Sequence, residues 1–105
     1  MKKLGFILAM LFSSFPLSAA ITGYHEGLIT TLSYEAQRGI IRIDKSFTDN
    51  GCTGAYADLT DEAQRVAYST ALAAKMANQK VRLRMEIGGV DYYSNCKVFE
   101  ITIMP

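Results

Sequence analysis

Two cysteines constrain this chain more than any other feature. Cys52 and Cys96 are the only cysteines among its 105 residues, and the N-terminus has the layout of an export signal, which places them in an oxidising compartment. We expect them to form a disulfide that closes a loop of 44 residues and contributes about 3–4 kcal/mol in the chain-entropy model. The alternative is a pair of free or metal-binding thiols. A zinc site would require more Cys or His ligands, and His25 is the only histidine.

The first twenty residues predict a secretory signal peptide. Lysines at 2–3 are followed by an uncharged apolar run over 4–12, and small residues at 18–20 supply the cleavage position. We expect cleavage after Ala20, with Ala19 as the alternative, and a secreted or periplasmic location. The competing interpretation is an uncleaved membrane anchor. The apolar run is shorter than the roughly 20 apolar residues that span a bilayer, so we expect no membrane span after cleavage.

The mature chain, residues 21–105, is short enough for a single domain. Without the two N-terminal lysines it has nine basic and ten acidic residues, a net charge of −1. This balance leaves no excess of basic residues of the kind that binds nucleic acid or an anionic membrane surface. A domain of this size buries only about 60–65% of its unfolded surface. We therefore expect a marginal core that needs a covalent link or a partner.

Alternating apolar and polar residues predict three strands before a helix and two strands after it. The expected strands are 27–34, 40–44, 55–59, 80–87 and 97–104. Simple alternation would place two sets of side chains on single faces of the first and last strands: Leu28, Thr30, Leu32 and Tyr34, and Phe99, Ile101 and Ile103. Turns are expected at 37–39 and at Asn50-Gly51, because Asn-Gly tolerates positive φ.

A helix is expected from an N-cap at Thr60 to Ala77, with Asn78 as a left-handed C-terminal residue. A stripe of alanines suits close packing on a sheet: Ala63, Ala67, Ala71 and Ala74. A bulkier stripe on another side consists of Tyr68, Leu72 and Met76. A helix that is apolar on several sides is usually covered on more than one side, so we expect this bulkier stripe in an oligomer interface. The alternative is that alanine simply favours helix and tolerates solvent.

The order β-β-β-α-β-β predicts an α+β fold or a small β-barrel. A five-stranded Greek-key barrel with its helix between the third and fourth strands is the OB-fold arrangement. We therefore expect residues 21–105 to form a single OB-fold-like domain with one disulfide.

This layout resembles the small exported B subunits of bacterial AB5-type toxins, in particular the subtilase cytotoxin B-subunit-like group. The resemblance spans most of residues 27–103. It is carried by glycine-initiated strands at Gly27-Leu-Ile-Thr and Gly39-Ile-Ile-Arg-Ile, the cysteine before the helix, the helix end ALAAKMANQKVRLRM, and a last strand entered by Cys96 and Val98.

The resemblance implies an OB-fold, a pentameric ring with the helices lining its centre, glycan binding on the barrel surface, and an exported A-type subunit as a partner. One position departs from the group. Where its members have a serine that contacts sialic acid, this chain has Glu26, and a carboxylate there would repel an anionic sugar. Glu26 is therefore a candidate ligand contact with an altered specificity.

The sequence gives no catalytic or cofactor motif. His25 lies between Tyr24 and Glu26 with no nucleophile in a recognisable pattern, and neither a phosphate-binding loop nor metal-ligand spacing is present. We expect neither an enzyme, nor a cofactor, nor a metal site. Cross-strand ion pairs are expected for the arginines of strand 80–87, Arg82 and Arg84, with Glu86 and Glu100.

The segment Tyr92, Tyr93, Ser94 and Asn95 is the candidate binding site. It combines aromatic faces with short hydrogen-bonding groups, a mixture that suits stacking on sugar rings or on a protein partner. The alternative is an ordinary exposed hairpin loop. We thus predict an exported non-enzymatic binding module, glycan-binding and forming a ring oligomer. The alternative function is a monomeric periplasmic accessory or structural protein.

Overall fold

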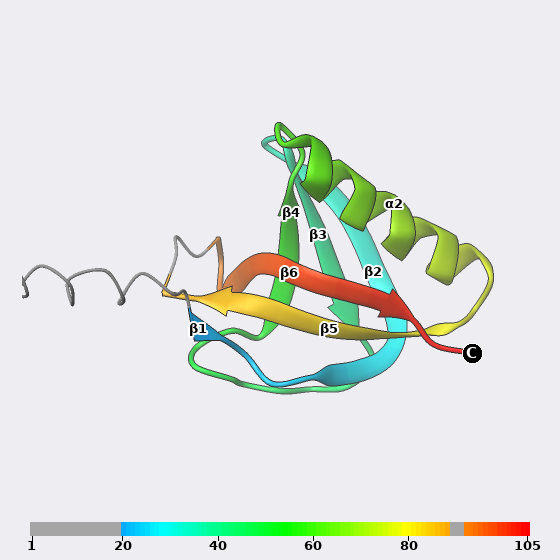
Figure 1. Cartoon of the computed structure of the whole chain (residues 1–105), viewed down its shortest axis with the longest axis horizontal. Helices are drawn as coiled ribbons and strands as arrows, with labels where there is room; N and C mark the ends of the chain where they lie inside the picture. Colours follow the sequence, from blue (N-terminus) through cyan, green and yellow to red (C-terminus); the bar gives the residue numbers. More distant parts are fainter. Residues whose placement is uncertain (1–19, 89–91) are drawn as a thin grey trace, which may run out of the picture.

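A computed structural model describes residues 20–88 and 92–105 (Figure 1). Residues 1–19 of the expected signal peptide, and 90–91 of the expected polar loop, lie outside these ranges. The described chain forms one helix and six strands. They are β1 (Ala20–Ile21), β2 (His25–Glu35), β3 (Arg38–Ile43), β4 (Gly54–Asp58), α2 (Glu62–Met76), β5 (Lys80–Ile87) and β6 (Asn95–Ile103).

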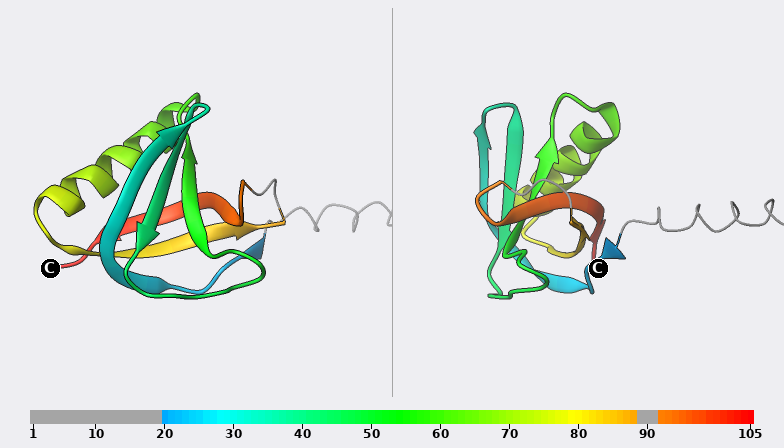
Figure 2. Two further views of the ribbon diagram at one scale, coloured as in Figure 1. Left: turned by 180° about the vertical axis from the view of Figure 1, so that it is seen from behind. Right: turned by 90° about the vertical axis from the view of Figure 1, so that its left-hand side faces the viewer.

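The strands form a ring. The long strand β2 pairs with β5 through its first residues and with β3 through its later ones. Strand β4 continues the sheet from β3 and joins β6 in parallel, and β6 pairs with β5 to close the circuit. Figure 2 shows how strongly β2 bends to reach both neighbours. The expected small β-rich domain with one helix and one disulfide is confirmed.

Register shifts in two strands make the expected simple alternation wrong. In β2, Ile29 pairs with Ile43 and Thr31 pairs with Arg42, so an extra residue lies between them. Ile29, before the inserted residue, is buried, and Leu32, after it, also packs against the core. An inserted residue shifts all following side chains to the other face of the strand.

The second shift reverses the expectation for the last strand. Met85 pairs with Val98, whereas Arg84 pairs with Glu100, so Phe99 is the inserted residue. Val98 is 1% exposed and Phe99 is 52% exposed. Phe99 therefore lies on the outer surface, whereas Ile101 and Ile103 pack against the core.

Two of the predicted left-handed turn residues are confirmed. Asn50 and Asn78 have φ of 53° and 56°. The β2–β3 turn uses Ala36 and Gln37, with φ of 53° and 63°, one residue earlier than expected.

The helix begins one residue later than the Thr60 cap predicts. Its N-cap is Asp61. The hydroxyl of Thr60 donates to Asp58 Oδ1 at 2.7 Å, so it does not cap the helix.

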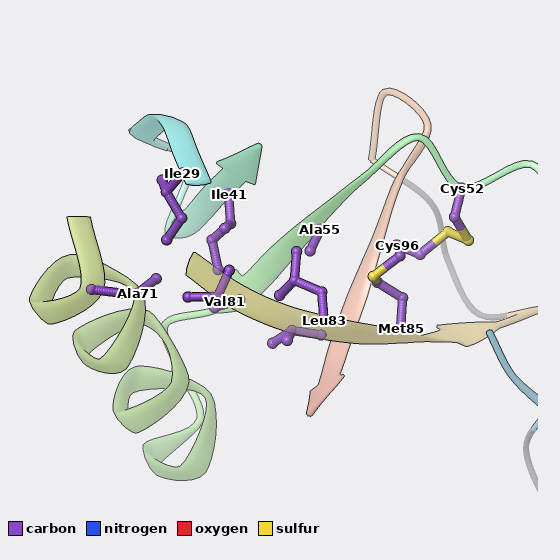
Figure 3. Packing of buried hydrophobic residues seen from close by; sticks show 12 residues of the cluster. Ile29, Ile41, Cys52, Ala55, Ala71, Val81, Leu83, Met85 and Cys96 are labelled. Carbon is purple, nitrogen blue, oxygen red and sulfur yellow. A yellow bond between two sulfur atoms is a disulfide. The ribbon is translucent and has the colours of Figure 1, made fainter. Parts of the chain in front are cut away.

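The core lies between the sheet ring and α2 (Figure 3). Ala71 and Ala74 are fully buried where the helix meets the sheet, and Ala67 packs against the core, as predicted, whereas Ala63 of the predicted stripe is exposed. The largest buried side chains are Ile41, Leu83, Met85, Val81 and Val98. The predicted Cys52–Cys96 disulfide is confirmed, with a Cα–Cα distance of 5.5 Å. It joins the segment before β4 to the start of β6.

Candidate functional site

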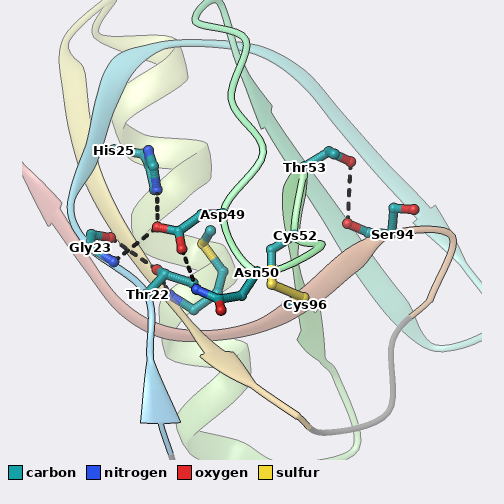
Figure 4. The surroundings of a disulfide bond; sticks show 10 residues. Thr22, Gly23, His25, Asp49, Asn50, Cys52, Thr53, Ser94 and Cys96 are labelled. Carbon is teal, nitrogen blue, oxygen red and sulfur yellow. Dashed lines mark hydrogen bonds and ion pairs between the residues drawn. A yellow bond between two sulfur atoms is a disulfide. The ribbon is translucent and has the colours of Figure 1, made fainter.

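Residues 92–95, the candidate binding segment, form a turn. The disulfide and two hydrogen bonds hold this turn against β4. Cys96 follows the turn, and the backbone N–H of Thr53 donates to the carbonyl oxygen of Ser94 at 2.8 Å. The hydroxyl of Thr53 donates to the same oxygen at 3.2 Å (Figure 4). The position of the turn is therefore set by the parallel pairing of β4 and β6.

The turn itself is tight and presents one tyrosine to solvent. Tyr92 and Asn95 exchange two backbone hydrogen bonds, each 2.9 Å long. Tyr93 and Ser94 have φ of 53° and 65°, a region that non-glycine residues occupy at a cost of about 1–3 kcal/mol each. Such conformations concentrate at functional sites. Tyr93 is 74% exposed, so its ring is available for contact.

Three aromatic rings gather beside an arginine and a glutamate. We call the set Glu35, Arg38, Tyr56, Tyr92 and Tyr93 the tyrosine cluster. The rings of Tyr92 and Tyr93 lie 4.6 Å apart, and those of Tyr92 and Tyr56 lie 6.3 Å apart. The guanidinium carbon of Arg38 lies 4.3 Å from the ring centroid of Tyr92. This distance is within the range of a cation–π contact.

The surroundings of the Tyr92 phenol raise its pKa above the ordinary tyrosine value. Removal from solvent raises its pKa, and the negative charge of Glu35 raises it further, whereas Arg38 acts in the opposite direction. The Tyr92 phenol also forms a hydrogen bond with Glu35. The cluster thus offers a neutral phenol, a guanidinium and a carboxylate around exposed aromatic surface.

Sequence analysis identified only part of this cluster. It identified Tyr92 and Tyr93 but missed Arg38, assigned to a turn, and Tyr56, assigned to a strand. Tyr56 is 36 residues from Tyr92, so no local pattern could connect them. The two-residue period of a strand puts Arg38 and Ile40 on one face of β3, and Ile40 pairs with Tyr56, which is only 7% exposed.

One predicted site residue does not present its side chain as expected. Asn95 is only 3% exposed, and within the described part of the chain its Oδ1 has no hydrogen-bond partner. Ser94 is exposed, and its backbone carbonyl oxygen accepts the hydrogen bonds from Thr53. Of the four predicted turn residues, the two tyrosines and Ser94 are therefore accessible to a ligand.

Glu26 lies at the other end of β2, away from the turn between β2 and β3. Its Oε2 accepts a hydrogen bond from Arg82 Nε at 3.1 Å. Arg82 therefore pairs with Glu26, not with Glu86, whereas the expected ion pair between Arg84 and Glu100 is present at 3.6 Å. Both arginines also face the ring of Tyr24. The structure does not bring Glu26 into the tyrosine cluster.

His25 has partners that its sequence neighbours did not indicate. Its Nε2 lies 2.8 Å from Asp49 Oδ2 (Figure 4). Its ring stacks on that of Phe47 with centroids 4.0 Å apart. Asp49 also accepts hydrogen bonds from the Gly23 N–H and the Asn50 side chain. The His25 bond contributes most to lowering the pKa of Asp49. These contacts fasten the β3–β4 loop to the start of β2.

The three residues of the expected oligomer stripe do not share one environment in the structure. Leu72 is 47% exposed and Met76 is 79% exposed. Tyr68 instead packs against the core cluster, and its hydroxyl donates to the Ser33 carbonyl oxygen at 3.3 Å. A shallow hollow of about 520 Å³ lies near the exposed helix surface, lined by Glu62, Arg65, Val66, Ser69, Thr70, Ala73 and Ile103.

No family model, curated protein or solved structure matches this chain. Within residues 20–88 and 92–105, no three His, Cys, Asp or Glu side chains gather in a way that could hold a metal ion. In the same part of the chain, no helix is both long and apolar enough to cross a membrane.

Proposed function

We propose that this protein is an exported, non-enzymatic binding module that binds a saccharide at the tyrosine cluster. One observation carries the proposal: Tyr92 and Tyr93 project from a tight turn beside the guanidinium of Arg38. The disulfide and the Thr53 hydrogen bonds hold this turn in place. A rigid aromatic surface loses little conformational entropy on binding.

The chemistry of the cluster suits a sugar better than a purely apolar ligand. Aromatic rings pack against the C–H faces of a pyranose, while phenol, guanidinium and carboxylate groups bond its hydroxyls. Glu35 accepts hydrogen bonds and Arg38 donates them, so the cluster offers both kinds of partner. The two tyrosines supply flat surface at the same place.

We also propose that the domain is an OB-fold. The connectivity supports this assignment, because β2 pairs with both β3 and β5, β4 runs parallel to β6, and α2 connects β4 to β5. In this fold the loops near the second and third barrel strands form a frequent ligand surface. The tyrosine cluster lies on the corresponding strands, β3 and β4, and on the loop before β6.

Assembly into a ring through α2 is the second part of the proposal. Val66, Leu72 and Met76 are exposed on the helix although they are large and apolar. Sedimentation of the oxidised chain should therefore report an oligomer, which Leu72→Asp with Met76→Asp should dissociate. If the wild-type chain is a monomer, the proposal of a ring is wrong and the alternative function, a monomeric accessory protein, is favoured.

A glycan array tests the saccharide proposal. We expect the wild-type chain to bind a subset of glycans, and Tyr92→Ala or Tyr93→Ala to lose that binding. Tyr34→Ala is the matched control, because Tyr34 is 65% exposed and pairs with Gly39, on the face of the hairpin opposite Arg38. Unchanged binding in both cluster variants would exclude the tyrosine cluster as the site.

A further inference from the structure

Arg42 differs from the other arginines in the described residues. Arg38, Arg65, Arg82 and Arg84 each donate a side-chain hydrogen bond to a carbonyl or carboxylate oxygen. The guanidinium of Arg42 makes no hydrogen bond or ion pair within residues 20–88 and 92–105, although the residue is partly buried. A guanidinium carries five N–H donors. These donors are not among the buried unsatisfied atoms of the described residues, so they are open to solvent and free to bind an external acceptor.

Arg42 lines a hollow whose chemistry suits an anion. The hollow has a volume of about 320 Å³ and contains two cationic side chains, three hydroxyl groups and no carboxylate. Its lining residues are Arg42, Ile43, Lys45, Ser46, Phe47, Thr48 and Thr53. The hydroxyl of Thr53 donates to Ser94, which leaves those of Ser46 and Thr48 as the donors nearest the two cations.

The acidic residues of the same loop are directed elsewhere. Asp44 Oδ1 accepts a hydrogen bond from the Leu28 N–H at 3.1 Å. Asp49 Oδ2 accepts bonds from His25 and from the Gly23 N–H. Both carboxylates thus accept hydrogen bonds from β2 and from the residues just before it. The cations of the hollow are left without an acidic partner from this loop.

A second unpaired polar group lies beside Arg42. A Cβ placed on Gly54 would lie 2.4 Å from Asn95 Oδ1 and 3.1 Å from Arg42 Nε, so both side chains converge over this glycine. Asn95 Oδ1 is buried and has no hydrogen-bond partner among the described residues. Unsatisfied buried groups are rare in folded proteins and require an explanation. Because Asn95 Oδ1 is an acceptor, a hydroxyl group of a ligand could satisfy it, whereas an anionic oxygen could not.

We propose that this hollow binds an anionic oxygen group, a sulfate or a carboxylate, carried by the saccharide that contacts the tyrosine cluster. The identity of the carrier rests on the proposed function. Arg38, Ile40 and Arg42 share one face of β3 by the two-residue period of a strand, and Ile40 between the two arginines is 8% exposed. Four strand residues span about 13 Å. The hollow and the tyrosine cluster therefore lie along one outer surface, which a short oligosaccharide can cover.

Calorimetric titration of the oxidised chain tests this proposal with four probes. They are a sulfated galactan oligosaccharide, the same oligosaccharide after removal of its sulfates, an oligogalacturonate, and sodium sulfate. We expect at least one of the two anionic saccharides to bind about tenfold or more tightly than the neutral one, as for hydrogen bonds to charged groups. Arg42→Gln combined with Lys45→Gln should abolish that preference and leave neutral binding unchanged.

Arg65→Gln is the matched control, because Arg65 is an exposed arginine on α2. Arg42→Lys separates charge from the guanidinium geometry and should retain part of the preference. Equal affinity for charged and neutral saccharides would overturn the proposal, as would a preference that survives the double variant. Sodium sulfate binding as tightly as the sulfated saccharide would also overturn it, showing an adventitious ion only.

The same titrations distinguish failure of this site from failure of the tyrosine cluster. If Tyr92→Ala abolishes neutral binding while no anionic preference exists, the proposed function stands and the anion site is wrong. If the anionic preference depends on Arg42 but Tyr92→Ala and Tyr93→Ala change nothing, the anion site stands and the tyrosine cluster is wrong.

Discussion

The ring of Tyr68 occupies the space that a side chain at Gly39 would need. A Cβ placed on Gly39 would lie 2.4 Å from both Cδ1 and Cε1 of that ring. The Tyr68 hydroxyl reaches onward to the Ser33 carbonyl oxygen at 3.3 Å. This contact connects α2 to the β2–β3 hairpin, on the face opposite the outward-pointing Arg38.

Gly39→Ala should destabilise the protein, because the added methyl group and the Tyr68 ring cannot occupy the same space. We expect the free energy of unfolding in urea to fall by about 1–3 kcal/mol, as for other overpacked cores. Gly23→Ala is the control, since a Cβ there would lie no closer than 3.7 Å to its nearest neighbour, Asp49 Oδ2. The effect of Gly39→Ala should shrink in a Tyr68→Ala background; an equal effect in both backgrounds would contradict a clash with this ring.

Replacing both cysteines with alanine should lower the free energy of unfolding by about 2–4 kcal/mol. The disulfide closes a separation of 44 residues, so its removal increases the freedom of the unfolded chain. Urea unfolding of the double variant measures the loss. Treating the wild-type chain with a reductant should give a similar loss and should leave the variant unaffected. Equal stability of the oxidised and reduced wild type would contradict the prediction.

Asp49 should make stability depend on pH in the acidic range. Its pKa is lowered from the usual value of 3.8, first by the hydrogen bond from His25 and then by that from Asn50. A lowered pKa means that the folded state favours the ionised carboxylate. This contribution is complete above the unfolded pKa and is lost as the pH falls through the lower folded pKa.

Asp49→Asn should therefore flatten the loss of stability that the wild type shows as the pH falls below 3.8. Urea unfolding midpoints measured across the acidic range provide the comparison. Asp61→Asn serves as a control for simple removal of a charge, because the Asp61 side chain makes no capping hydrogen bond. If the wild type and Asp49→Asn lose stability equally as the pH falls, the contact between Asp49 and His25 does not contribute to the pH dependence of folding.

The phenol of Tyr92 should ionise above the ordinary tyrosine value of 10.0, because desolvation and Glu35 both raise its pKa. Ultraviolet absorbance follows the ionisation of the tyrosines during an alkaline titration. In Tyr92→Phe, one of the phenols that ionise at the highest pH should be missing. Burial also raises the pKa of Tyr68, so one late phenol should remain. Glu35→Gln should lower the pKa of Tyr92, and Tyr34→Phe provides the exposed control. A late phase that Tyr92→Phe does not reduce would contradict the cluster geometry.

The sequence by itself determined the local features of this protein. The single cysteine pair predicted the disulfide, alternation within residues 80–87 predicted a strand there, and Asn50 and Asn78 marked positive-φ positions. Each of these features depends on side-chain chemistry or on neighbours a few residues away. That information can be read from a short window of sequence.

Only the tertiary structure decided the faces of the bulged strands. Thr30 and Phe99 are ordinary strand residues by composition, and nothing local shows that they are the inserted ones. A register shift arises when a strand bends to pair with two neighbours, and it reverses every side chain that follows.

The candidate sites also required distant residues to meet. Tyr56 reaches Tyr92 because β4 pairs with β6, and His25 reaches Asp49 because the β3–β4 loop returns to β2. The hollow around Arg42 exists because Asp44 and Asp49 are bound elsewhere. Strand pairing brings these groups together, and their separation along the chain of 24 residues or more hides them from any periodicity.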